Sequence, residues 1–573
     1  MNVTRLKKIQ TTLTQLTGRA AIGATLLCAL PVAASAANYP LELMHPRAAG
    51  TASEPGAPPI GEHHRVFWAY PGLEYNIRAA VIGGAFPYKY ALSNAPAGMT
   101  IDAASGTVSW PNPPAGAHVT PSLTVTDQEG SVVSSTWTIR VDAGRFLFVD
   151  AVNGREFDAP SPGTGTIDNP FRRIRDIYSG DTAATKLIAT HARKIVYFKQ
   201  GTYNIDGFLE NVGAYDGYSL GRMPISEATK PVAWLAFPGQ TPTIDGRCQA
   251  AAKPMGPRPC NRGAHIAFYG PANNVYWDGL RIVNVAIHGV RTEGAGNYQV
   301  FRRGTWTTQG PTVRSANAGM ITFYASGGAG SSMGWGITIQ DNVLSDIDGG
   351  MCVELYSVQH ILIEDNVCHT VYSSNGTADD GGVFIKGGEM RRVTVRGNTF
   401  HDLARRAIAG NMLVLRSAEI LFNRVYNVRN IKNYTADGNY NPVALELNQN
   451  GAAGVIHIYR NTLVGRVFVY NTDEADGPFY FQQNVIVNDD PGTHIFFEDV
   501  TAPARVVVTD NLVGKPGDRI VDGNGNLTGS HAAQIGKRGH QRSDVKPDRP
   551  AGRGSPKPEA NKGVARSRAA HVR

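Results

Sequence analysis

The chain has 573 residues, of which 18% are charged, and it contains 64 glycines. This length predicts more than one domain, and the composition favours β-structure with many tight turns. The formal net charge of +8 does not indicate a basic nucleic-acid-binding domain, because the tail from about residue 536 carries eleven Lys/Arg against three Asp/Glu and accounts for all of it. We expect residues 530–573 to be a disordered, solvated basic tail.

The N-terminus predicts export. Basic residues up to Arg19 precede an apolar run from Ala20 to Val32, and the small residues Ala34, Ser35 and Ala36 follow. This is the pattern of a signal peptide over residues 1–36. The apolar run is shorter than the ~20 residues that span a bilayer, and no later stretch is long enough. We therefore expect a protein that is secreted, periplasmic or attached to the cell surface.

Residues 37–60 are rich in Pro, Ala and Gly and are expected to form a linker. Residues 61–142 alternate apolar and polar side chains between turn signals, which predicts a compact all-β domain. This stretch resembles the immunoglobulin-like modules, related to cadherin-type repeats, of bacterial surface proteins. The matching residues are Pro96, Gly98-Met99, Ile101-Asp102, Gly106 and Val125-Thr126-Asp127. The resemblance implies a small β-sandwich that acts as a spacer or a binding aid.

The stretch from Trp335 to Val513 contains seven copies of one phrase, in which two apolar residues precede an Asn and another follows it. The asparagines are Asn342, Asn366, Asn398, Asn423, Asn461, Asn484 and Asn511. Alternation within each copy predicts a strand, and units this small have to stack to bury their apolar faces. Asn suits the bend between strands, because it tolerates the left-handed region and its amide can bond to the next copy.

This pattern resembles the right-handed parallel β-helix family of secreted polysaccharide-active proteins, the pectate-lyase-like group. The resemblance covers about residues 143–529, and Phe171–Ile177 is expected to be a short helix that caps the open end. It implies an all-β fold, a right-handed parallel β-helix preceded by a small β-sandwich, and we expect a monomer. The fold carries lyases, hydrolases, epimerases and non-catalytic adhesins, so it does not specify the activity.

The repeat is interrupted between Val290 and Ala318, which predicts an inserted loop. Its Arg302, Arg303 and Trp306 are candidate substrate contacts, since aromatic rings stack on sugars and arginines pair with carboxylates. Burial of the aromatic residues against the solenoid wall is an equal alternative.

Equal offsets from the repeated Asn become columns about 4.8 Å apart between coils. Twelve residues before the Asn lie Glu354 and Lys386, and Glu446 joins them if a short loop is allowed for. Alternation predicts that these three side chains point outward while Met351, Val353 and Leu355 point inward. A second column contains Asp348, Asp380 and Arg405, with Asp379 beside it.

These columns predict a lyase site. The carboxylates Asp348, Glu354, Asp379 and Asp380 could hold Ca²⁺ through oxygen ligands. The segment ADDGGVFIKGG resembles the Lys-Gly-Gly coil of secreted β-helix proteins, which implies Lys386 as the base. Arg405 would steer the uronate, and Glu446 would contact the substrate. We therefore expect Ca²⁺-assisted β-elimination on an acidic polysaccharide.

Two alternatives stay open. Glu354 and Lys386 could be an ion pair on the wall of a non-catalytic glycan-binding surface or matrix protein. The Asp379-Asp380 pair would suit a glycoside hydrolase, although the Gly-His-Gly and Arg-Ile-Lys phrases of polygalacturonases are missing. His369 and His401, each three residues after its Asn, are expected to stack in a loop column as turn residues or as alternative acid/base groups.

Five cysteines are present, and Cys28 lies in the signal peptide. Cys248 and Cys260 bracket a Pro/Gly-rich loop and are a candidate disulfide. Cys368 is expected to point inward and Cys352 to lie on the opposite phase of its strand, which favours two separate thiols.

Overall fold

The computed structural model describes residues 39–178, 194–204, 223–224, 233–246, 266–269, 273–285, 288–293, 296–309, 319–324, 334–372, 381–429, 431–434, 438–440, 443–449, 454–470, 479–487, 495–497, 506–509, 511–513 and 520–521. The predicted signal peptide, the Cys248–Cys260 pair, the Asp379-Asp380 pair and the basic tail lie outside the described residues. None of the described helices has the length and apolar character of a membrane span.

The N-terminal module is a small β-sandwich with its own core around Tyr75, Trp110 and Trp137. Its elements are β1 (Glu42–His45), a 3-10 turn (Arg65–Phe67), β2 (Trp68–Ala69), β3 (Tyr75–Arg78), β4 (Ala80–Ile82), β5 (Lys89–Ser93), β6 (Thr100–Ile101), β7 (Thr107–Trp110), β8 (His118–Val119), β9 (Ser122–Thr126), β10 (Val132–Thr136) and β11 (Ile139–Val141). The expected linker is wrong in part, because β1 falls within it and pairs antiparallel with β4. All four residues of β1 are buried, so this segment belongs to the fold.

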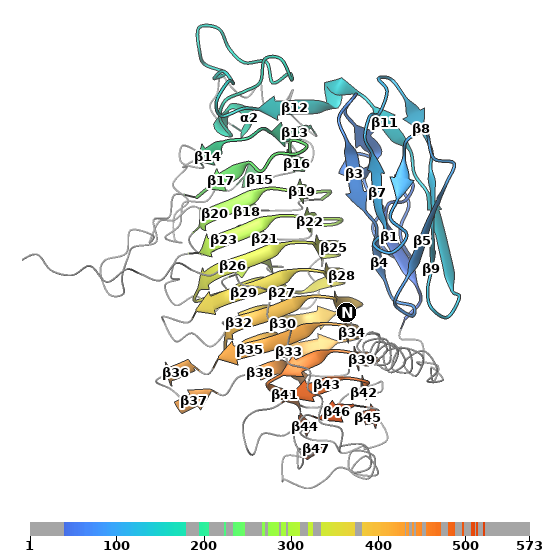
Figure 1. Cartoon of the computed structure of the whole chain (residues 1–573), viewed down its shortest axis with the longest axis vertical. Coiled ribbons are helices and arrows are strands. Elements are labelled where there is room, and N and C mark those ends of the chain that lie inside the picture. The colour runs from blue at the N-terminus through green and yellow to red at the C-terminus, as the bar shows by residue number, and fades with distance from the viewer. Residues whose placement is uncertain are drawn as a thin grey trace, which may run out of the picture.

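A second 3-10 turn (Ala143–Arg145) leads into three long parallel sheets, to which successive coils contribute strands in turn (Figure 1). The first sheet contains β12 (Phe146–Val149), β13 (Ile195–Phe198), β16 (Ala233–Ala236), β19 (Tyr276–Asp278), β22 (Val300–Arg302), β25 (Gly334–Gln340), β28 (Val358–Glu364), β31 (Val393–Arg396), β34 (Ala418–Leu421), β39 (Ile456–Tyr459), β42 (Phe479–Gln482) and β45 (Val506–Thr509).

The second sheet contains β14 (Thr202–Asn204), β17 (Thr243–Asp245), β20 (Arg281–Val285), β23 (Thr305–Gln309), β26 (Val343–Asp348), β29 (Val367–Tyr372), β32 (Thr399–Ala404), β35 (Arg424–Arg429), β40 (Thr462–Val464), β43 (Val485–Val487) and β46 (Leu512–Val513). The third sheet contains β15 (Met223–Pro224), β18 (Ile266–Tyr269), β21 (Val290–Glu293), β24 (Gly319–Tyr324), β27 (Met351–Tyr356), β30 (Gly381–Met390), β33 (Arg406–Leu415), β38 (Val443–Gln449), β41 (Arg466–Tyr470), β44 (Ile495–Phe497) and β47 (Ile520–Val521).

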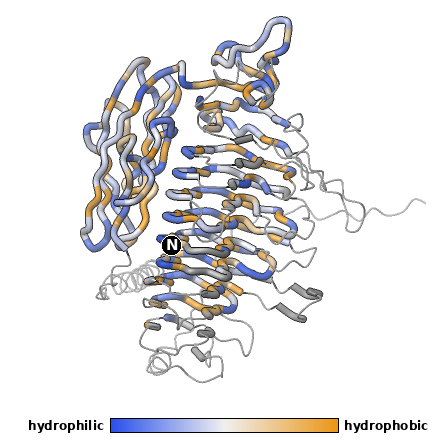
Figure 2. Tube along the Cα trace, turned by 180° about the vertical axis from the view of Figure 1, so that it is seen from behind, coloured by the Kyte–Doolittle hydropathy of each residue, from blue (hydrophilic) through white to orange (hydrophobic). Residues whose placement is uncertain are grey.

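A hairpin of β36 (Ile431–Tyr434) and β37 (Gly438–Tyr440) projects from the solenoid, and α2 (Arg175–Tyr178) lies near its first coil. Apolar and polar residues alternate along each coil (Figure 2), and the inward-facing apolar columns form one continuous core. The predicted fold, a parallel β-helix preceded by a small β-sandwich, is confirmed.

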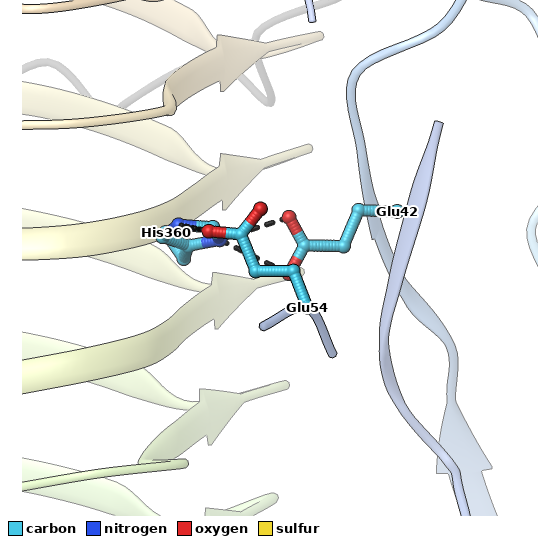
Figure 3. A group of neighbouring side chains, drawn as sticks. All are labelled: Glu42, Glu54 and His360. Atoms are coloured by element: carbon cyan, nitrogen blue, oxygen red, sulfur yellow. Dashed lines mark hydrogen bonds and ion pairs between the residues drawn. The ribbon is translucent and has the colours of Figure 1, made fainter. Parts of the chain in front are cut away.

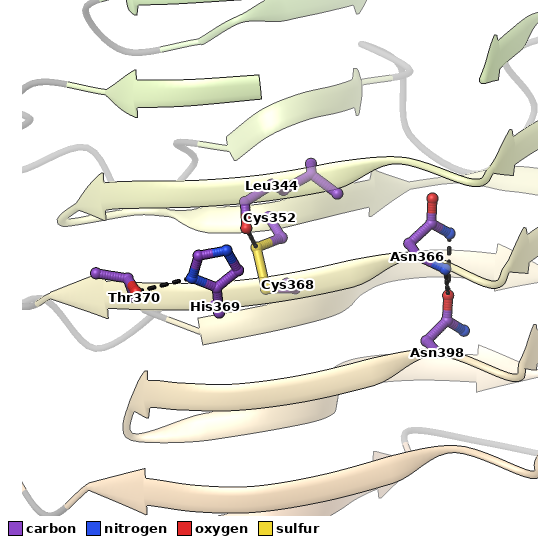
Figure 4. Close-up of a disulfide and its surroundings, with 7 residues drawn as sticks. All are labelled: Leu344, Cys352, Asn366, Cys368, His369, Thr370 and Asn398. Carbon is purple, nitrogen blue, oxygen red and sulfur yellow. Dashed lines mark hydrogen bonds between the residues drawn. A yellow bond between two sulfur atoms is a disulfide. The ribbon is translucent and has the colours of Figure 1, made fainter. Parts of the chain in front are cut away.

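The repeated asparagines form one buried ladder at the bend between the first and second sheets. Each Nδ2 donates to the Oδ1 of the next Asn at 2.9 or 3.0 Å, from Asn342 to Asn511. Figure 4 shows the rung between Asn366 and Asn398. The predicted amide bonding is therefore confirmed. The left-handed residue at this bend is however the one before the Asn, such as Asp341 or Asp365, because the Asn side chain itself has to face inward to reach the ladder.

Cys352 and Cys368 form a disulfide with their Cα atoms 6.1 Å apart (Figure 4). The expectation of two separate thiols was wrong. At the corner that opens the third sheet, Cys352 and Val353 both lie in the interior although they are consecutive. Met351 packs instead with Phe384 in a separate cluster. Strict alternation fails at this corner, since the chain changes direction there and two adjacent residues face the core.

The module docks on the outer face of the first sheet through buried ion pairs. Arg78 of β3 lies 3.2 Å from Glu364 and 2.6 Å from Asp365. Arg396 of β31 donates to Glu364 at 2.6 Å and also to the Tyr88 hydroxyl and the Val81 carbonyl of the module. These charged groups lose contact with water only when module and solenoid are in contact, so their pairing holds the two parts together in the folded chain. The module is therefore more than a spacer.

His45, at this buried interface, predicts acid sensitivity. Burial, together with the charges of Arg302 and Arg47, lowers the pKa of His45 to about 3. The unfolded chain therefore takes up a proton that the folded chain refuses, so stability is complete above the unfolded pKa near 6.5 and falls as the pH drops towards 3. We expect a loss of about 2 kcal/mol from this group at pH 5. Urea unfolding at pH 7 and pH 5 measures the change in the free energy of unfolding, and His45→Gln should reduce the difference between the two pH values. An unchanged difference would contradict the prediction.

Candidate functional site

The outer face of the third sheet carries the predicted lysine, but the register differs from the predicted one. Lys386 pairs with Tyr356 and Asn411, whereas Glu354 pairs with Phe384. The predicted Glu354–Lys386 column was therefore wrong by two residues. Strand β30 continues to Met390. The segment from Lys386 to its ladder Asn398 is therefore two residues longer than the segment from its register partner Tyr356 to Asn366 in the preceding coil. Counting residues back from the Asn cannot detect that the segment between strand and Asn differs in length from coil to coil.

This face is closed around an aromatic ring. Phe384 is buried, and the cationic groups of Lys386 and Arg406 each lie 5.6 Å from its ring centroid. Arg406 also forms an ion pair with Glu446 at 2.9 Å. Glu354 is fully buried in the same face. Arg405 is buried as well, and its backbone is left-handed. Ion pairing and packing are therefore the main features of this wall among the described residues.

The predicted calcium ligands are not brought together in the part of the chain that the structure describes. Asp348 ends a strand of the second sheet beside Tyr372, and Glu354 belongs to the third sheet. Asp379 and Asp380 lie outside the described residues. Among the described residues, the potential metal-ligand atoms that do converge belong to Glu42, Glu54 and His360.

That cluster fits an ion-pair clamp better than a metal site (Figure 3). His360 Nδ1 lies 2.8 Å from Glu42, and its Nε2 lies 3.1 Å from Glu54. Because each ring nitrogen faces a different carboxylate, the geometry suits an imidazolium that donates twice. Arg392 also contacts Glu42 at 2.7 Å and Glu54 at 2.6 Å. Burial raises the pKa of Glu42, but the hydrogen bond and charge of His360 and the hydrogen bonds from Ser53 and Arg392 together outweigh it, so the net pKa is lowered.

The expected insertion at 290–318 is wrong in its described part, because β21, β22 and β23 form an ordinary coil. Trp306 is buried in the core and stacks on Trp277 with ring centroids 6.0 Å apart, so it cannot stack on a sugar. The coil escaped the sequence pattern because Gly304 takes the ladder position, where its N–H donates to Asn342. A Cβ at Gly304 would lie 2.5 Å from the Trp306 ring.

Arg302 and Arg303 point to the boundary between solenoid and module. Arg302 is buried and donates to Asn76 of the module at 3.0 Å. Arg303 is exposed and forms a two-pronged pair with Asp278 at 2.6 and 2.9 Å. These two residues therefore contribute to a site at the domain boundary rather than to the wall around Lys386.

A row of titratable side chains crosses the outer face of the second sheet. We call it the histidine face, and its members are Asp346, His369, His401, Asp402, Arg424 and Tyr426. His369, His401 and Tyr426 are register partners on β29, β32 and β35. Their rings stack almost parallel at centroid distances of 5.0 Å. The predicted stacking of the two histidines is confirmed, although they lie in strands and not in loops.

A repeated backbone bend holds this row in line. The residue after each ring is left-handed, at Thr370, Asp402 and Asn427, as is Asp346 in the preceding coil. At this bend His401 Nδ1 lies 2.7 Å from the Asp402 carboxylate, which Asn427 also contacts. His369 Nδ1 lies 2.8 Å from the Thr370 hydroxyl (Figure 4). Tyr426 was missed from the sequence, although it shares the offset of three residues from its ladder Asn.

The electrostatics of the histidine face suit acid–base chemistry. Burial and the neighbouring His401 lower the pKa of His369, so this ring is neutral at pH 7. Burial and the Asp402 charge raise the pKa of Tyr426, so its phenol keeps its proton. Asp402 can hold the Nδ1–H tautomer of His401, which leaves Nε2 as a proton acceptor. Arg424 is exposed two residues before Tyr426 and adds a cation.

Comparison with known proteins bears on the module. Residues 64–142 match the family model described as "Putative Ig domain". The N-terminal module is an immunoglobulin-like domain. None of the curated proteins compared with the chain matches it.

Two solved structures show some similarity to this chain. One is a family 28 exopolygalacturonase of Yersinia enterocolitica, at 11% identity over 79% of this chain and 96% of that chain, with a TM-score of 0.34. The other is a "putative alpha-galactosidase" of Bacteroides fragilis NCTC 9343, at 9% identity over 35% of this chain and 50% of that chain, with a TM-score of 0.14. The parallel β-helix rests on the sheet topology of this chain and not on these similarities.

Proposed function

We propose that the protein is exported, binds an acidic polysaccharide along the histidine face and cleaves it by β-elimination. The observation that carries the proposal is the His401–Asp402 pair, aligned with Tyr426 on the outer face of the solenoid. Successive coils present side chains at a spacing of about 4.8 Å along a straight wall. Tyr372 is exposed on the same sheet and offers an aromatic surface to a sugar ring. A linear polymer suits such a wall.

Each residue would have one role in the reaction. Arg424 would pair with the uronate carboxylate and make the C5 proton more acidic. His401 Nε2 would remove that proton while Asp402 stabilises the imidazolium that forms. The C4–C5 double bond would form as the C4–O bond breaks, and Tyr426 would give its proton to the departing oxygen. Proton transfer from His401 to Tyr426 through solvent would restore both groups.

Lys386 is a second candidate base within this proposal, with Arg405 as the residue that would steer the uronate. What favours it is the adjacent Arg406, which adds a second cation beside the Phe384 ring. What weighs against it is the burial of Phe384 and Glu354 in the same face. A Ca²⁺ requirement would depend on Asp379 and Asp380, which lie outside the described residues. The experiment below therefore compares activity with and without Ca²⁺.

A non-catalytic glycan-binding protein is the second candidate function. The parallel stacking of the rings favours it, because each stacked ring covers its neighbour and a purely structural ladder would look the same. On this reading, the polymer would contact only the ring edges and the exposed charges of Asp346 and Arg424.

The test is an assay of the full mature protein on pectate, alginate and glycosaminoglycans, each with Ca²⁺ or EDTA. Ultraviolet absorbance of unsaturated product reports β-elimination, and new reducing ends without that absorbance report hydrolysis. The proposal expects both signals together. Reducing ends alone would replace the lyase with a hydrolase. If neither signal appears but glycan binding is measurable, the second candidate function, a non-catalytic glycan-binding protein, replaces the lyase.

A further inference from the structure

A cleft of about 300 Å³ lies between the immunoglobulin-like module and the first coils of the solenoid. The module contributes Arg65, Glu74 and Asn76, and the solenoid contributes Asp278 and Arg303. The turn after β16, from Phe237 to Thr241, and Thr305 supply the remaining polar and apolar wall. Such a volume is at the lower end of the roughly 300–1,000 Å³ typical of small-molecule pockets, so it suits one small ligand and not a polymer.

The charges around this cleft are unbalanced. The cleft is lined by the guanidinium groups of Arg65 and Arg303 and the carboxylates of Glu74 and Asp278, and a third guanidinium, of Arg302, lies outside the lining beside Asp278. Asp278 is shared, since Arg302 lies 3.5 Å from one of its oxygens and Arg303 forms the two-pronged pair. Burial raises the pKa of Asp278, but the charges of Arg302, Arg303 and Arg65 and the hydrogen bonds from Arg303 together outweigh it, so the net pKa is lowered and the carboxylate is charged.

Arg65 is the least compensated cation of this cleft, because the carboxylate its charge acts on, Asp278, is already paired with Arg302 and Arg303. Its side chain is buried against the Tyr75 and Phe146 rings, at 4.9 and 6.0 Å from their centroids. It donates to the Trp68 carbonyl and contacts the Tyr197 hydroxyl, but its Nε has no hydrogen-bond partner and it forms no ion pair with any described residue. A buried cation whose nearby carboxylate is shared with two other arginines is only partly compensated, and an anion in the adjoining cleft would offset the remaining cost.

Arg303 provides a directed donor for such an anion. Its Nε and Nη2 are used on Asp278, and no described residue accepts from its Nη1. Asn76 and Thr305 line the cleft beside it and can bond to hydroxyl groups. The combination of two cations with several neutral polar groups matches a small ligand that carries one negative charge and several hydroxyls.

We propose that this cleft binds a single sugar acid, a monosaccharide or chain end whose carboxylate pairs with Arg65 and Arg303. The site is distinct from the histidine face and does not require it to be catalytic. Because module and solenoid each supply one of the two cations, the ligand would bind only when the two are docked. The module would thereby take part in recognition.

Isothermal titration of the full mature protein with galacturonate tests this, with galactose and inorganic phosphate as separate arms. We expect galacturonate to bind, galactose not to bind, and Arg303→Gln to weaken galacturonate binding about 10- to 100-fold, the range expected for one charge-assisted hydrogen bond. Thr241→Trp should also abolish binding by filling the cleft without touching an arginine, whereas Thr100→Trp, an exposed threonine of the module, should not.

The outcomes separate this proposal from the polysaccharide activity. His401→Ala should leave galacturonate binding unchanged even if it abolishes cleavage. Equal binding of galactose would replace the sugar acid with a neutral sugar, and phosphate binding alone would replace it with an inorganic anion. Galacturonate binding that survives both Arg303→Gln and Thr241→Trp, or no binding to the folded protein, would overturn the proposal.

Discussion

Replacing His401 by alanine is expected to lower the rate of formation of unsaturated product about 10²- to 10⁴-fold, the usual contribution of a positioned general base. His401 is the ring whose Nδ1 lies 2.7 Å from a carboxylate, so it is the imidazole best held to accept a proton at Nε2. Asp402→Asn should cause a smaller loss, because the amide keeps the shape but no longer stabilises the imidazolium. Initial rates on the best substrate of the panel measure both effects.

The control is His118→Ala, an exposed histidine of the module, which should leave the rate unchanged. Lys386→Ala in parallel decides between the two candidate bases. If His401→Ala keeps full activity while Lys386→Ala loses it, the reaction belongs to the third sheet and the histidine ladder is structural. If neither variant changes the rate, both assignments are wrong.

Replacing Glu364 by alanine is expected to destabilise the protein by about 3–5 kcal/mol, as is typical when one partner of a buried ion pair is removed. Glu364 is buried and accepts from Arg396 at 2.6 Å and from Gln340 at 2.8 Å, and it lies 3.2 Å from Arg78 of the module. Burial raises the pKa of Glu364, but Arg396 and Arg78 outweigh it, so the carboxylate is charged. Without it, Arg396 has no ion-pair partner among the described residues, whereas Arg78 keeps Asp341 and Asp365.

Equilibrium unfolding in urea measures this loss, and limited proteolysis between module and solenoid reports whether docking fails first. Glu129→Ala, at an exposed turn of the module, serves as the matched control and should change stability by less than about 0.5 kcal/mol. Glu364→Gln should fall between the two, because it keeps the volume and loses the charge. A loss below about 1 kcal/mol in Glu364→Ala would mean that the interface tolerates an unpaired guanidinium.

The two histidines of the candidate site were found from the sequence because they share one offset from the ladder Asn, and the same offset leads to Tyr426. The dyad partner Asp402 was not singled out, since adjacent residues in a strand normally point to opposite faces. The left-handed backbone at Asp402 turns its carboxylate back towards His401. Such a bend leaves no trace in the alternation of apolar residues.

The failures around Lys386 and Trp306 have a common origin. A column position depends on the length of every arm between sheet and ladder, and β30 is longer than its neighbour. An entire coil was missed where Gly304 occupies the ladder position. Its residue type does not match the Asn pattern, although its backbone N–H still bonds to Asn342. The cysteine pair was misjudged at a corner, where consecutive residues both face the core.

The sequence by itself determined the β-helix, the Asn ladder and the presence of the N-terminal sandwich. These depend on short periods that local composition expresses directly, since each strand needs its own apolar residues and each bend its own Asn. Only the tertiary structure decided the docking of module and solenoid, the closed state of the Lys386 wall and the cleft between Arg65 and Arg303. The docking contacts and the cleft join residues more than two hundred positions apart, and the Lys386 wall joins residues of successive coils. Their charged groups come together only when the chain folds, and no local pattern records that.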